Sequence, residues 1–170
     1  MQTEKVIDYI VNWLKDYATK AGVKGFVIGV SGGVDSGVVS TLCAMTGLKV
    51  LALEMPIRQQ KDQASRALEH IDFLKNKFPN VEGFTVDLNE PFEALYKTFD
   101  VKDDEFPAEK LAFANTRSRL RMLTLYYYGQ INGLLVCGTG NKVEDFGIGF
   151  YTKYGDGGVD VSPIADLYKT

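Results

Sequence analysis

Residues 25–36 read Gly-Phe-Val-Ile-Gly-Val-Ser-Gly-Gly-Val-Asp-Ser, an apolar run that passes directly into a glycine-rich turn. A continuous apolar run of this length is typical of a strand buried on both faces in a parallel sheet. The glycines at 32 and 33 allow the backbone to turn sharply and to approach a ligand closely. A helix is expected from about Asp35 to Met45. This strand–turn–helix unit decides the fold class.

The rest of the chain repeats the alternation of strands and helices. Apolar residues at helical spacing predict a helix over 4–21, before the first strand. Further strands are expected at 49–54, 82–86 and 134–137, and further helices at 62–78, 91–99 and 108–130. The acidic residues 100–107 are expected to form a loop, and the glycine-rich residues 138–163 to be mostly loop. This alternation predicts an α/β fold, a doubly wound parallel sheet with flanking helices.

Composition limits the possible functions. The 170 residues are 45% hydrophobic and 24% charged, and one domain over 1–170 is expected. A net charge of −3 argues against a nucleic-acid partner. Neither a membrane-spanning run nor a signal-peptide pattern is visible, so no membrane association and a cytoplasmic location are expected. Cys43 and Cys137 are expected to be buried free thiols, and the single histidine, His70, excludes a multi-histidine metal site.

The predicted helix over 108–130 is apolar on more than one side. One side is expected to carry Leu111, Ala114, Met122 and Leu125, and roughly the opposite side Phe113, Leu120 and Tyr127. A helix that is apolar on two sides has to be covered on both. In so small a domain one side is expected to pack against a second copy, which predicts a homodimer formed through this helix.

The turn Ser31–Ser36 has the chemistry of a phosphate-binding site. In open α/β sheets, ligands bind beyond the carboxyl ends of the strands, and this turn directly follows a strand. The next helix begins with unpaired N–H groups and a partial positive charge, and Ser31 and Ser36 add hydroxyl donors. The turn is neither a Walker A sequence nor a dinucleotide GxGxxG motif. Because the Asp35 carboxylate would repel phosphate, a Mg²⁺ ion is expected between them.

The turn Ser31–Ser36 resembles the pyrophosphate loop of the N-type ATP pyrophosphatases. That superfamily includes NAD synthetases, GMP synthetases and tRNA-thiolating enzymes. Later stretches resemble the NAD synthetases in particular: Asn115–Met122, Gly138–Glu144, Phe150–Asp160 and Pro163–Lys169. The likeness covers nearly the whole chain, and it points to the ammonia-dependent NAD synthetases, which have the adenine nucleotide alpha hydrolase-like fold. Members of that family continue further, so a C-terminal part is expected to be missing from these 170 residues.

The resemblance implies a role for each matching position. ATP would be bound by Gly29, Val30, Ser31, Gly32, Gly33, Val34, Asp35, Ser36, Thr139 and Lys169. Mg²⁺ would be held by Asp35 and Glu144, and deamido-NAD by Arg119, Lys153 and Asp160. No protein nucleophile is implied. The carboxylate of deamido-NAD would attack the α-phosphorus of ATP with loss of pyrophosphate, and ammonia would convert the acyl-adenylate into NAD and AMP.

Some of these positions can be weighed from the residues themselves. Arg117 and Arg121 are spaced i, i+4 and share a helix face, where salt bridging and ligand binding are both open. Arg119 points elsewhere on an apolar helix, where an unpaired buried charge would be costly, and this favours a binding role. His70 is expected to be a surface or packing residue.

Two alternatives to NAD synthesis stay open at this stage. One is another N-type ATP pyrophosphatase, either GMP-forming or tRNA-thiolating. The other is a truncated module that binds ATP without turnover. The presence of both carboxylates, Asp35 and Glu144, argues against the second alternative.

Overall fold

The computed structural model describes residues 2–58, 61–99 and 106–169 of the chain. Its centre is a sheet of four parallel strands in the order β3-β2-β1-β4. The strands are β1 (Gly25–Gly29), β2 (Lys49–Glu54), β3 (Val81–Thr85) and β4 (Leu134–Val136). The apolar runs predict all four strands, and the parallel pairing confirms the predicted sheet.

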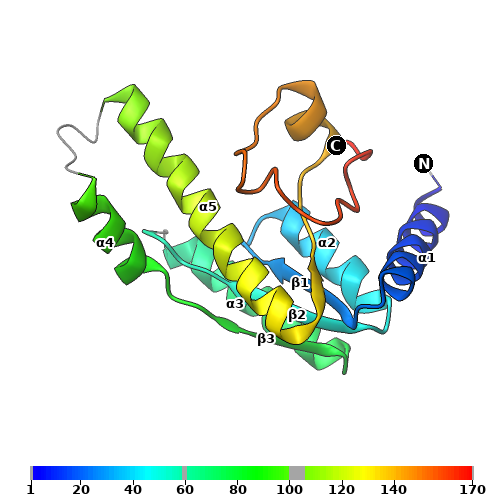
Figure 1. The fold of residues 1–170 in the computed structure, drawn as a ribbon. Coiled ribbons are helices and arrows are strands. Elements are labelled where there is room, and N and C mark those ends of the chain that lie inside the picture. Colours follow the sequence, from blue (N-terminus) through cyan, green and yellow to red (C-terminus); the bar gives the residue numbers. More distant parts are fainter. Residues whose placement is uncertain (1, 59–60, 100–105, 170) are drawn as a thin grey trace.

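Helices cover both faces of this sheet (Figure 1). One face carries α1 (Thr3–Ala21), α2 (Val34–Met45) and α3 (Lys61–Lys77). The other face carries α4 (Asn89–Thr98) and α5 (Pro107–Asn132). The predicted doubly wound α/β fold is therefore confirmed.

Two apolar clusters hold these layers together, one on each face of the sheet. Successive strand residues point to opposite faces, so Phe26 and Ile28 enter one cluster and Val27 the other. Cys43 of α2 and Cys137 after β4 lie buried in the first cluster as free thiols, with their Sγ atoms 3.4 Å apart. Burial raises the pKa of Cys137, which keeps this thiol protonated. The prediction of buried free thiols is confirmed.

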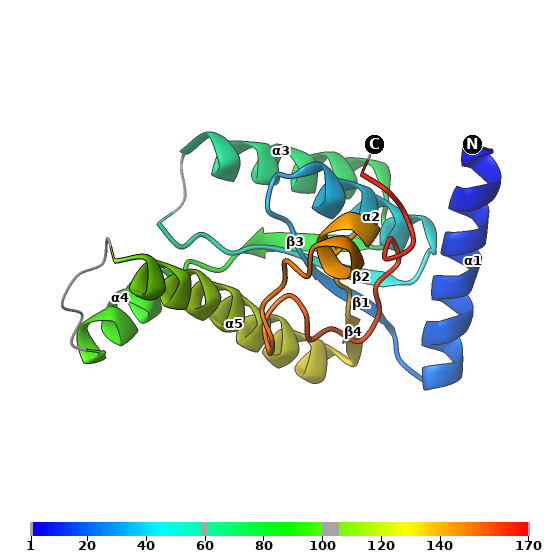
Figure 2. The same ribbon diagram turned by 90° about the horizontal axis from the view of Figure 1, so that it is seen from above.

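The direction of winding reverses in the middle of the sheet. From β1 the chain builds β2 and then β3 outward on one side, and α5 then returns it to the other side of β1, where β4 pairs. Such a switch point opens a crevice at the carboxyl ends of the strands, where ligands bind. The turn after β1 and the segment after β4 both lie at this edge, and Figure 2 shows the segment after β4, in orange and red, in front of the strands.

One predicted loop is confirmed and another needs correction. Residues 138–163 are mostly loop, as expected, with one π-helical turn, η1 (Lys142–Gly147). Of the loop expected over 100–107, residues 100–105 lie outside the described residues. Pro107 already belongs to α5, because proline is well suited to the first turn of a helix.

The predicted apolar sides of α5 are also partly wrong. Phe113 and Leu120, expected opposite Met122, pack into the same cluster as Met122. The cause is α4, whose Phe92 lies edge-on against the ring of Phe113 and so extends the buried part of α5. Leu111, expected on the buried side, is 60% exposed. The exposed apolar side is formed instead by Leu123, Tyr126, Tyr127 and Ile131.

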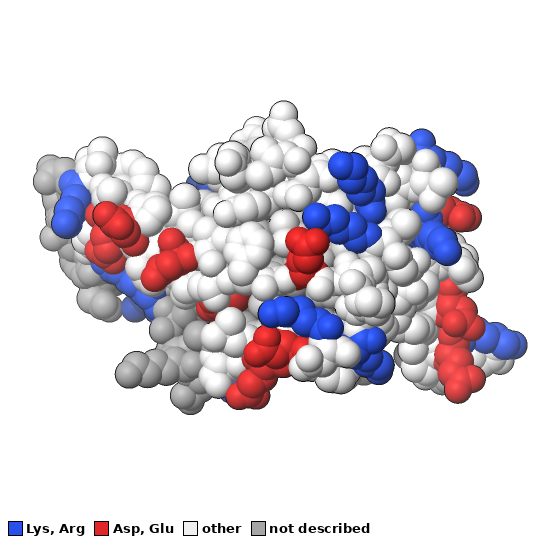
Figure 3. All heavy atoms as spheres, turned by 90° about the horizontal axis from the view of Figure 1, so that it is seen from below, with Lys and Arg blue, Asp and Glu red and all other residues white. Residues whose placement is uncertain are grey.

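Charged side chains are intermixed on the surface that Figure 3 shows, which is the side opposite to that of Figure 2. Lys and Arg alternate there with Asp and Glu between large neutral areas. No broad basic area covers the described residues on this side, in agreement with the net charge of −3. None of the described helices is both long and apolar enough to span a bilayer.

Candidate active site at the switch point

The turn after β1 is braced by its own two serines. The hydroxyl of Ser36, buried at 3% exposure, donates to the carbonyl of Gly33 at 2.9 Å and accepts from the Ser31 N–H at 3.2 Å. The hydroxyl of Ser31 accepts from the Gly33 N–H at 3.3 Å. The sequence suggests Ser36 as a hydroxyl donor to a ligand, but this hydroxyl is used inside the turn. Ser36 therefore shapes the site from within.

The N-terminus of α2 leaves backbone donors available beside this turn. The first bond of the helix runs from the Gly37 N–H to the Gly33 carbonyl at 3.1 Å. The N–H groups of residues 34–36 come before this bond, so they have no acceptor within α2. Gly32 adopts a φ of +78°, a conformation that favours glycine, and the chain passes from this turn directly into α2. Together these groups can accept a phosphate.

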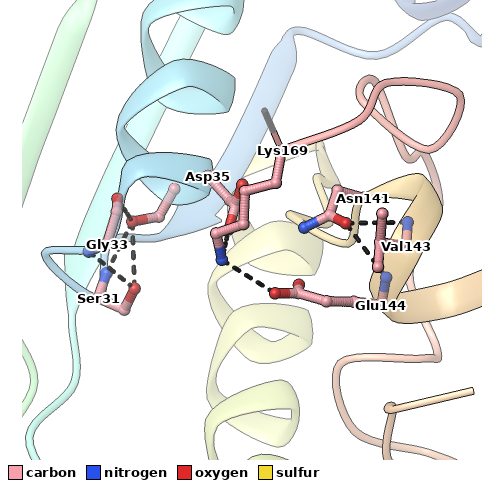
Figure 4. A network of polar contacts seen from close by, with 8 residues as sticks. Ser31, Gly33, Asp35, Asn141, Val143, Glu144 and Lys169 are labelled. Atoms are coloured by element: carbon pink, nitrogen blue, oxygen red, sulfur yellow. Dashed lines mark hydrogen bonds and ion pairs between the residues drawn. The ribbon is translucent and has the colours of Figure 1, made fainter. Parts of the chain in front are cut away.

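Asp35, Glu144 and Lys169 come together across the switch point (Figure 4). The Lys169 Nζ lies 2.9 Å from Oδ2 of Asp35 and 3.0 Å from Oε1 of Glu144. The hydrogen bond to Asp35, followed by that to Glu144, raises the pKa of Lys169, so the ammonium stays charged. The resemblance implies that all three belong to one site, and the structure brings them into direct contact.

The donor set at this point fits Mg²⁺ bound together with a nucleotide. Asp35 and Glu144 converge on one position that a cation, the Lys169 ammonium, already fills. Mg²⁺ in proteins is usually held by one or two carboxylates, with phosphate oxygens and waters completing its shell. Among the described residues there is no group of three or more His, Cys, Asp or Glu side chains that could hold a metal by itself. A metal here would need phosphate oxygens as well.

A cavity of about 620 Å³ lies at the same edge of the sheet. Ser31 after β1 and Thr139 after β4 both line it, together with Met122 of α5 and the segment 149–159. A larger hollow of about 720 Å³ opens between α1, α2 and α3. The larger one is lined by Gly32, Gly33 and Val34 of the turn but by no described residue after β4, whereas the smaller one joins both strands of the switch point. The smaller cavity is therefore the candidate nucleotide site.

Arg121 and Arg117 have different surroundings although they share a helix face. Arg121 lines the cavity, and its Nε donates to the Met55 carbonyl at 3.0 Å. Burial lowers the pKa of Arg121, and the nearby Arg117 adds to this effect. Arg117 lies over the Phe92 ring, 5.8 Å from its centroid. Neither arginine forms a salt bridge with a described residue, so the salt-bridging interpretation gains no support.

The three residues matched to deamido-NAD binding lie along one side of α5. Arg119 is exposed and donates through Nε to the Lys153 carbonyl at 3.1 Å. The carboxylate of Asp160 accepts from the Tyr126 hydroxyl at 3.0 Å and from the Val136 N–H at 2.8 Å. Burial, then the bond to Asp160, raises the pKa of Tyr126 to about 12.

The exposure of Arg119 differs from what the sequence predicts. Arg119 is exposed because it points away from the sheet, so the argument from a buried charge is wrong. Arg119 and Tyr126 are two helical turns apart on the same side of α5. The three matched residues therefore form an extended surface and do not meet at one point.

The glycine-dense segment after η1 is docked on α5. The Ser118 hydroxyl donates to Oδ1 of Asp156 at 2.6 Å, and the Asp156 N–H returns to Ser118 at 3.0 Å. Thr152 donates to Asn115 at 2.9 Å. A Cβ atom on Gly155 would lie 2.3 Å from the Ser118 hydroxyl, so only glycine fits there without movement. The glycines thus allow close packing on the helix.

Asn141 is a site residue that the motifs do not single out. It is 1% exposed, and its Oδ1 accepts from the N–H groups of Val143 and Glu144, both at 3.1 Å. The pattern Asn-x-x-Glu over 141–144 is a helix-start signal that could have predicted η1. His70 lies outside this group, half-buried, with Nε2 2.9 Å from the Ser40 hydroxyl.

Comparison with known proteins identifies the family. Residues 6–170 match the family model described as NAD synthase. The chain is 39% identical to the NH(3)-dependent NAD(+) synthetase of Finegoldia magna over 171 residues, 100% of this chain and 66% of that protein. It is 41% identical to the enzyme of the same name from Saccharolobus solfataricus, covering 98% of this chain and 57% of that one. The chain spans about two thirds or less of the length of these relatives.

Solved structures agree with the sequence comparison. An NMN synthetase from Francisella tularensis has a TM-score of 0.87 and 35% identity, covering 99% of this chain and 67% of that one. An NH3-dependent NAD synthetase from Campylobacter jejuni, in complex with nitrate, has a TM-score of 0.86 and 31% identity, covering 99% and 69%. The fold, the sequence match and the arrangement of the switch point agree, and the chain belongs to the NAD synthase family.

Proposed function

We propose that this protein catalyses the ATP-dependent amidation of deamido-NAD to NAD with ammonia, releasing AMP and pyrophosphate. The observation that carries the proposal is the meeting of Asp35 and Glu144 at one cation position beside the phosphate-binding turn. Family membership favours this reaction over GMP formation and tRNA thiolation. The protein would thus be a ligase that forms a carbon–nitrogen bond.

The turn and the carboxylates would handle the phosphates. The N–H groups of residues 34–36 would bind phosphate oxygens, and Asp35 and Glu144 would hold Mg²⁺. That ion would neutralise charge on the leaving pyrophosphate. Lys169, released from the two carboxylates, would pair with the phosphates and keep the local charge balanced.

The cavity at the switch point would take the adenosine part of ATP. Its walls are largely apolar, with Met55, Met122 and Leu125 among them, which suits a planar base. Thr139 supplies a hydroxyl on the β4 side, and Gly29 allows a close approach on the β1 side. This arrangement supports the ATP contacts that the resemblance implies.

Arg119, Lys153 and Asp160 would bind the nicotinate-bearing nucleotide along α5. Arg119 donates to the main-chain carbonyl of Lys153, and the Lys153 ammonium lies over the Tyr154 ring, 5.0 Å from its centroid. The two cations would attract an anionic substrate to this part of α5. The substrate class is broader than one compound, because a relative at 35% identity is named an NMN synthetase. The assay therefore has to offer both nicotinic acid mononucleotide and deamido-NAD.

A second copy of the chain would cover the exposed apolar side of α5. Leu123, Tyr126 and Tyr127 lie within about two turns of each other and are 67%, 39% and 60% exposed. Leu123→Glu should shift the sedimentation of the protein toward the monomer at micromolar concentration. A wild-type protein that is strictly monomeric there would contradict the homodimer. The cytoplasmic location stays a prediction.

The deciding experiment incubates the protein with ATP, Mg²⁺, ammonium and deamido-NAD, and quantifies NAD and AMP by chromatography. Equal amounts of NAD and AMP are expected. A parallel reaction replaces deamido-NAD with nicotinic acid mononucleotide and follows NMN. Formation of neither amide product would overturn the proposal, and ATP binding without turnover would favour the ATP-binding module.

A further inference from the structure

The side chain of Asn141 is buried, but only its amide oxygen forms hydrogen bonds with described residues. Its Oδ1 accepts two backbone N–H bonds, whereas its Nδ2 has no hydrogen-bond partner among the described residues. The orientation of the amide is fixed, because only the oxygen can accept from Val143 and Glu144. A buried amide nitrogen without an acceptor is costly, so its presence calls for an explanation.

The oxygen of this amide holds Glu144 in place. The six residues of η1 are too few to form a stable helix by themselves. Asn141 caps the turn, and the neighbouring Lys142 N–H bonds to the Leu167 carbonyl at 2.9 Å, which ties the turn to the segment that carries Lys169. In a capping box, the glutamate at position N3 would reach back to the capping residue. Glu144 reaches Lys169 instead, so its carboxylate is directed into the site.

The nitrogen of the same amide is buried, and it lies on the side of Asp35 and Lys169. Figure 4 shows it on the side of Asn141 where Asp35 and Lys169 lie, whereas Oδ1 faces Val143 and Glu144. Asp35 is next to the backbone donors of the turn. A phosphate group bound there would bring acceptor oxygens toward this amide nitrogen.

We propose that Asn141 has two roles in the nucleotide site: Oδ1 positions Glu144 for the metal, and Nδ2 donates to a phosphate oxygen of the bound nucleotide. The proposal rests on the proposed function for the identity of that nucleotide. Asn141 is thus a positioning residue through one atom and a direct ligand through the other.

The test compares Asn141→Ala, Asn141→Ser and Asn80→Ala with the wild type. Serine caps helices about as well as asparagine but has no amide donor, so it restores the cap alone. Asn80 is the matched control. Its Nδ2 donates to the carbonyls of Ala44 and Leu48 at 2.9 and 2.7 Å, away from the site.

Two calorimetric measurements separate the two roles, and neither needs deamido-NAD. The affinity for ATP in the presence of EDTA reports on the amide donor. The gain in ATP affinity when Mn²⁺ is added reports on the placement of Glu144. Asn141→Ala should lose about fivefold in each quantity. Asn141→Ser should lose the first but keep the Mn²⁺ gain within about twofold of the wild type.

Asn80→Ala should lower the melting temperature and leave both affinities unchanged. The proposal is overturned if Asn141→Ala binds ATP normally in both conditions, if Asn141→Ser does not recover the Mn²⁺ gain, or if Asn80→Ala causes the same losses. A wild type that binds ATP with Mn²⁺ but forms no NAD would contradict the proposed function alone. A wild type without Mn²⁺-dependent ATP binding would contradict both.

Discussion

The two sides of the candidate site are held in different ways. On the β1 side, the turn Ser31–Ser36 is braced by contacts among its own residues, five or fewer positions apart. On the β4 side, Glu144 meets a lysine 25 residues later, and Asp156 docks on a serine 38 residues earlier. One side is organised locally, and the other by contacts between distant parts of the chain.

This difference indicates that the two sides of the site have different roles. The local side presents backbone donors whose positions follow from the strand–turn–helix unit. The long-range side supplies a carboxylate, a lysine and the surface along α5. Substitutions on the first side should therefore affect nucleotide chemistry directly, and those on the second should affect placement and substrate binding.

The largest effect is expected where the two sides meet. Asp35→Ala removes one of the two carboxylates that would hold Mg²⁺, so kcat/KM for NAD formation should fall by about 100-fold or more. Asp72→Ala is the control, because Asp72 is an exposed carboxylate on α3 that pairs with Lys75 at 3.6 Å. Full turnover by Asp35→Ala would remove the metal assignment from this residue.

The next effect should appear in substrate binding on the β4 side. In Gly155→Ala the added Cβ would lie 2.3 Å from the Ser118 hydroxyl and 3.0 Å from the Thr152 Cβ, which pushes the docked segment off α5. The KM for deamido-NAD should rise about tenfold, and ATP affinity should fall by a smaller factor, because the same segment lines the cavity proposed for adenosine.

The control for this variant is Gly47→Ala. Gly47 has a φ of +73° and open space around it, so alanine there costs about 1 kcal/mol of stability through backbone strain without touching the site. An equal rise in KM for Gly47→Ala would show that Gly155→Ala acts through general destabilisation. Steady-state kinetics and thermal melting of the two variants decide.

The difference between local and long-range contacts also explains which features the sequence could predict. The strands, the helices and the turn Ser31–Ser36 follow from apolar periodicity and glycine placement, which are local properties. The depth to which α5 is buried depends on α4 packing against Phe113, and no pattern within α5 contains that information. Arg119 is exposed for a similar reason, since its direction depends on how the whole helix sits on the sheet.

The β4 side was harder to predict for a physical reason. Glycine-rich stretches suggest loops, but here Gly155 permits close packing against Ser118. The turn η1 is stabilised by Asn141 and by the Leu167 carbonyl rather than by helix propensity. The pairing of Lys169 with two carboxylates joins α2, η1 and the end of the described chain, and only the family resemblance placed them in one site.

A smaller effect should appear in the protein without nucleotide. Lys169→Met removes the ammonium that lies between Asp35 and Glu144, so Mn²⁺ should bind these carboxylates several-fold more tightly in the absence of ATP. ATP affinity should fall, because the same lysine would pair with phosphate. Electron paramagnetic resonance of free Mn²⁺ measures the first change and calorimetry the second.

Lys142→Met is the matched control for this variant. The ammonium of Lys142 lies over the Tyr168 ring, 5.3 Å from its centroid, two residues before Glu144 in the sequence. Mn²⁺ affinity should stay at the wild-type value there. An unchanged or weaker Mn²⁺ affinity in Lys169→Met would show that Lys169 does not occupy the cation position in solution.

The smallest effect is a pH-dependent change in stability. It concerns the contact of His70 with α2, the helix that follows the turn on the β1 side. Burial lowers the pKa of His70 below its usual value of 6.5, and its Nε2 lies 2.9 Å from the hydroxyl of Ser40 on α2. The unfolded chain then binds a proton more readily than the folded one, so this stabilisation is present above pH 6.5 and is lost as the pH falls toward the lowered pKa. The melting temperature of the wild type should drop between pH 7.5 and 5.5 by more than that of His70→Gln, which cannot be protonated. Parallel pH profiles of the two proteins would mean that His70 does not couple the packing of α2 to pH, and that the β1 side depends on its turn alone.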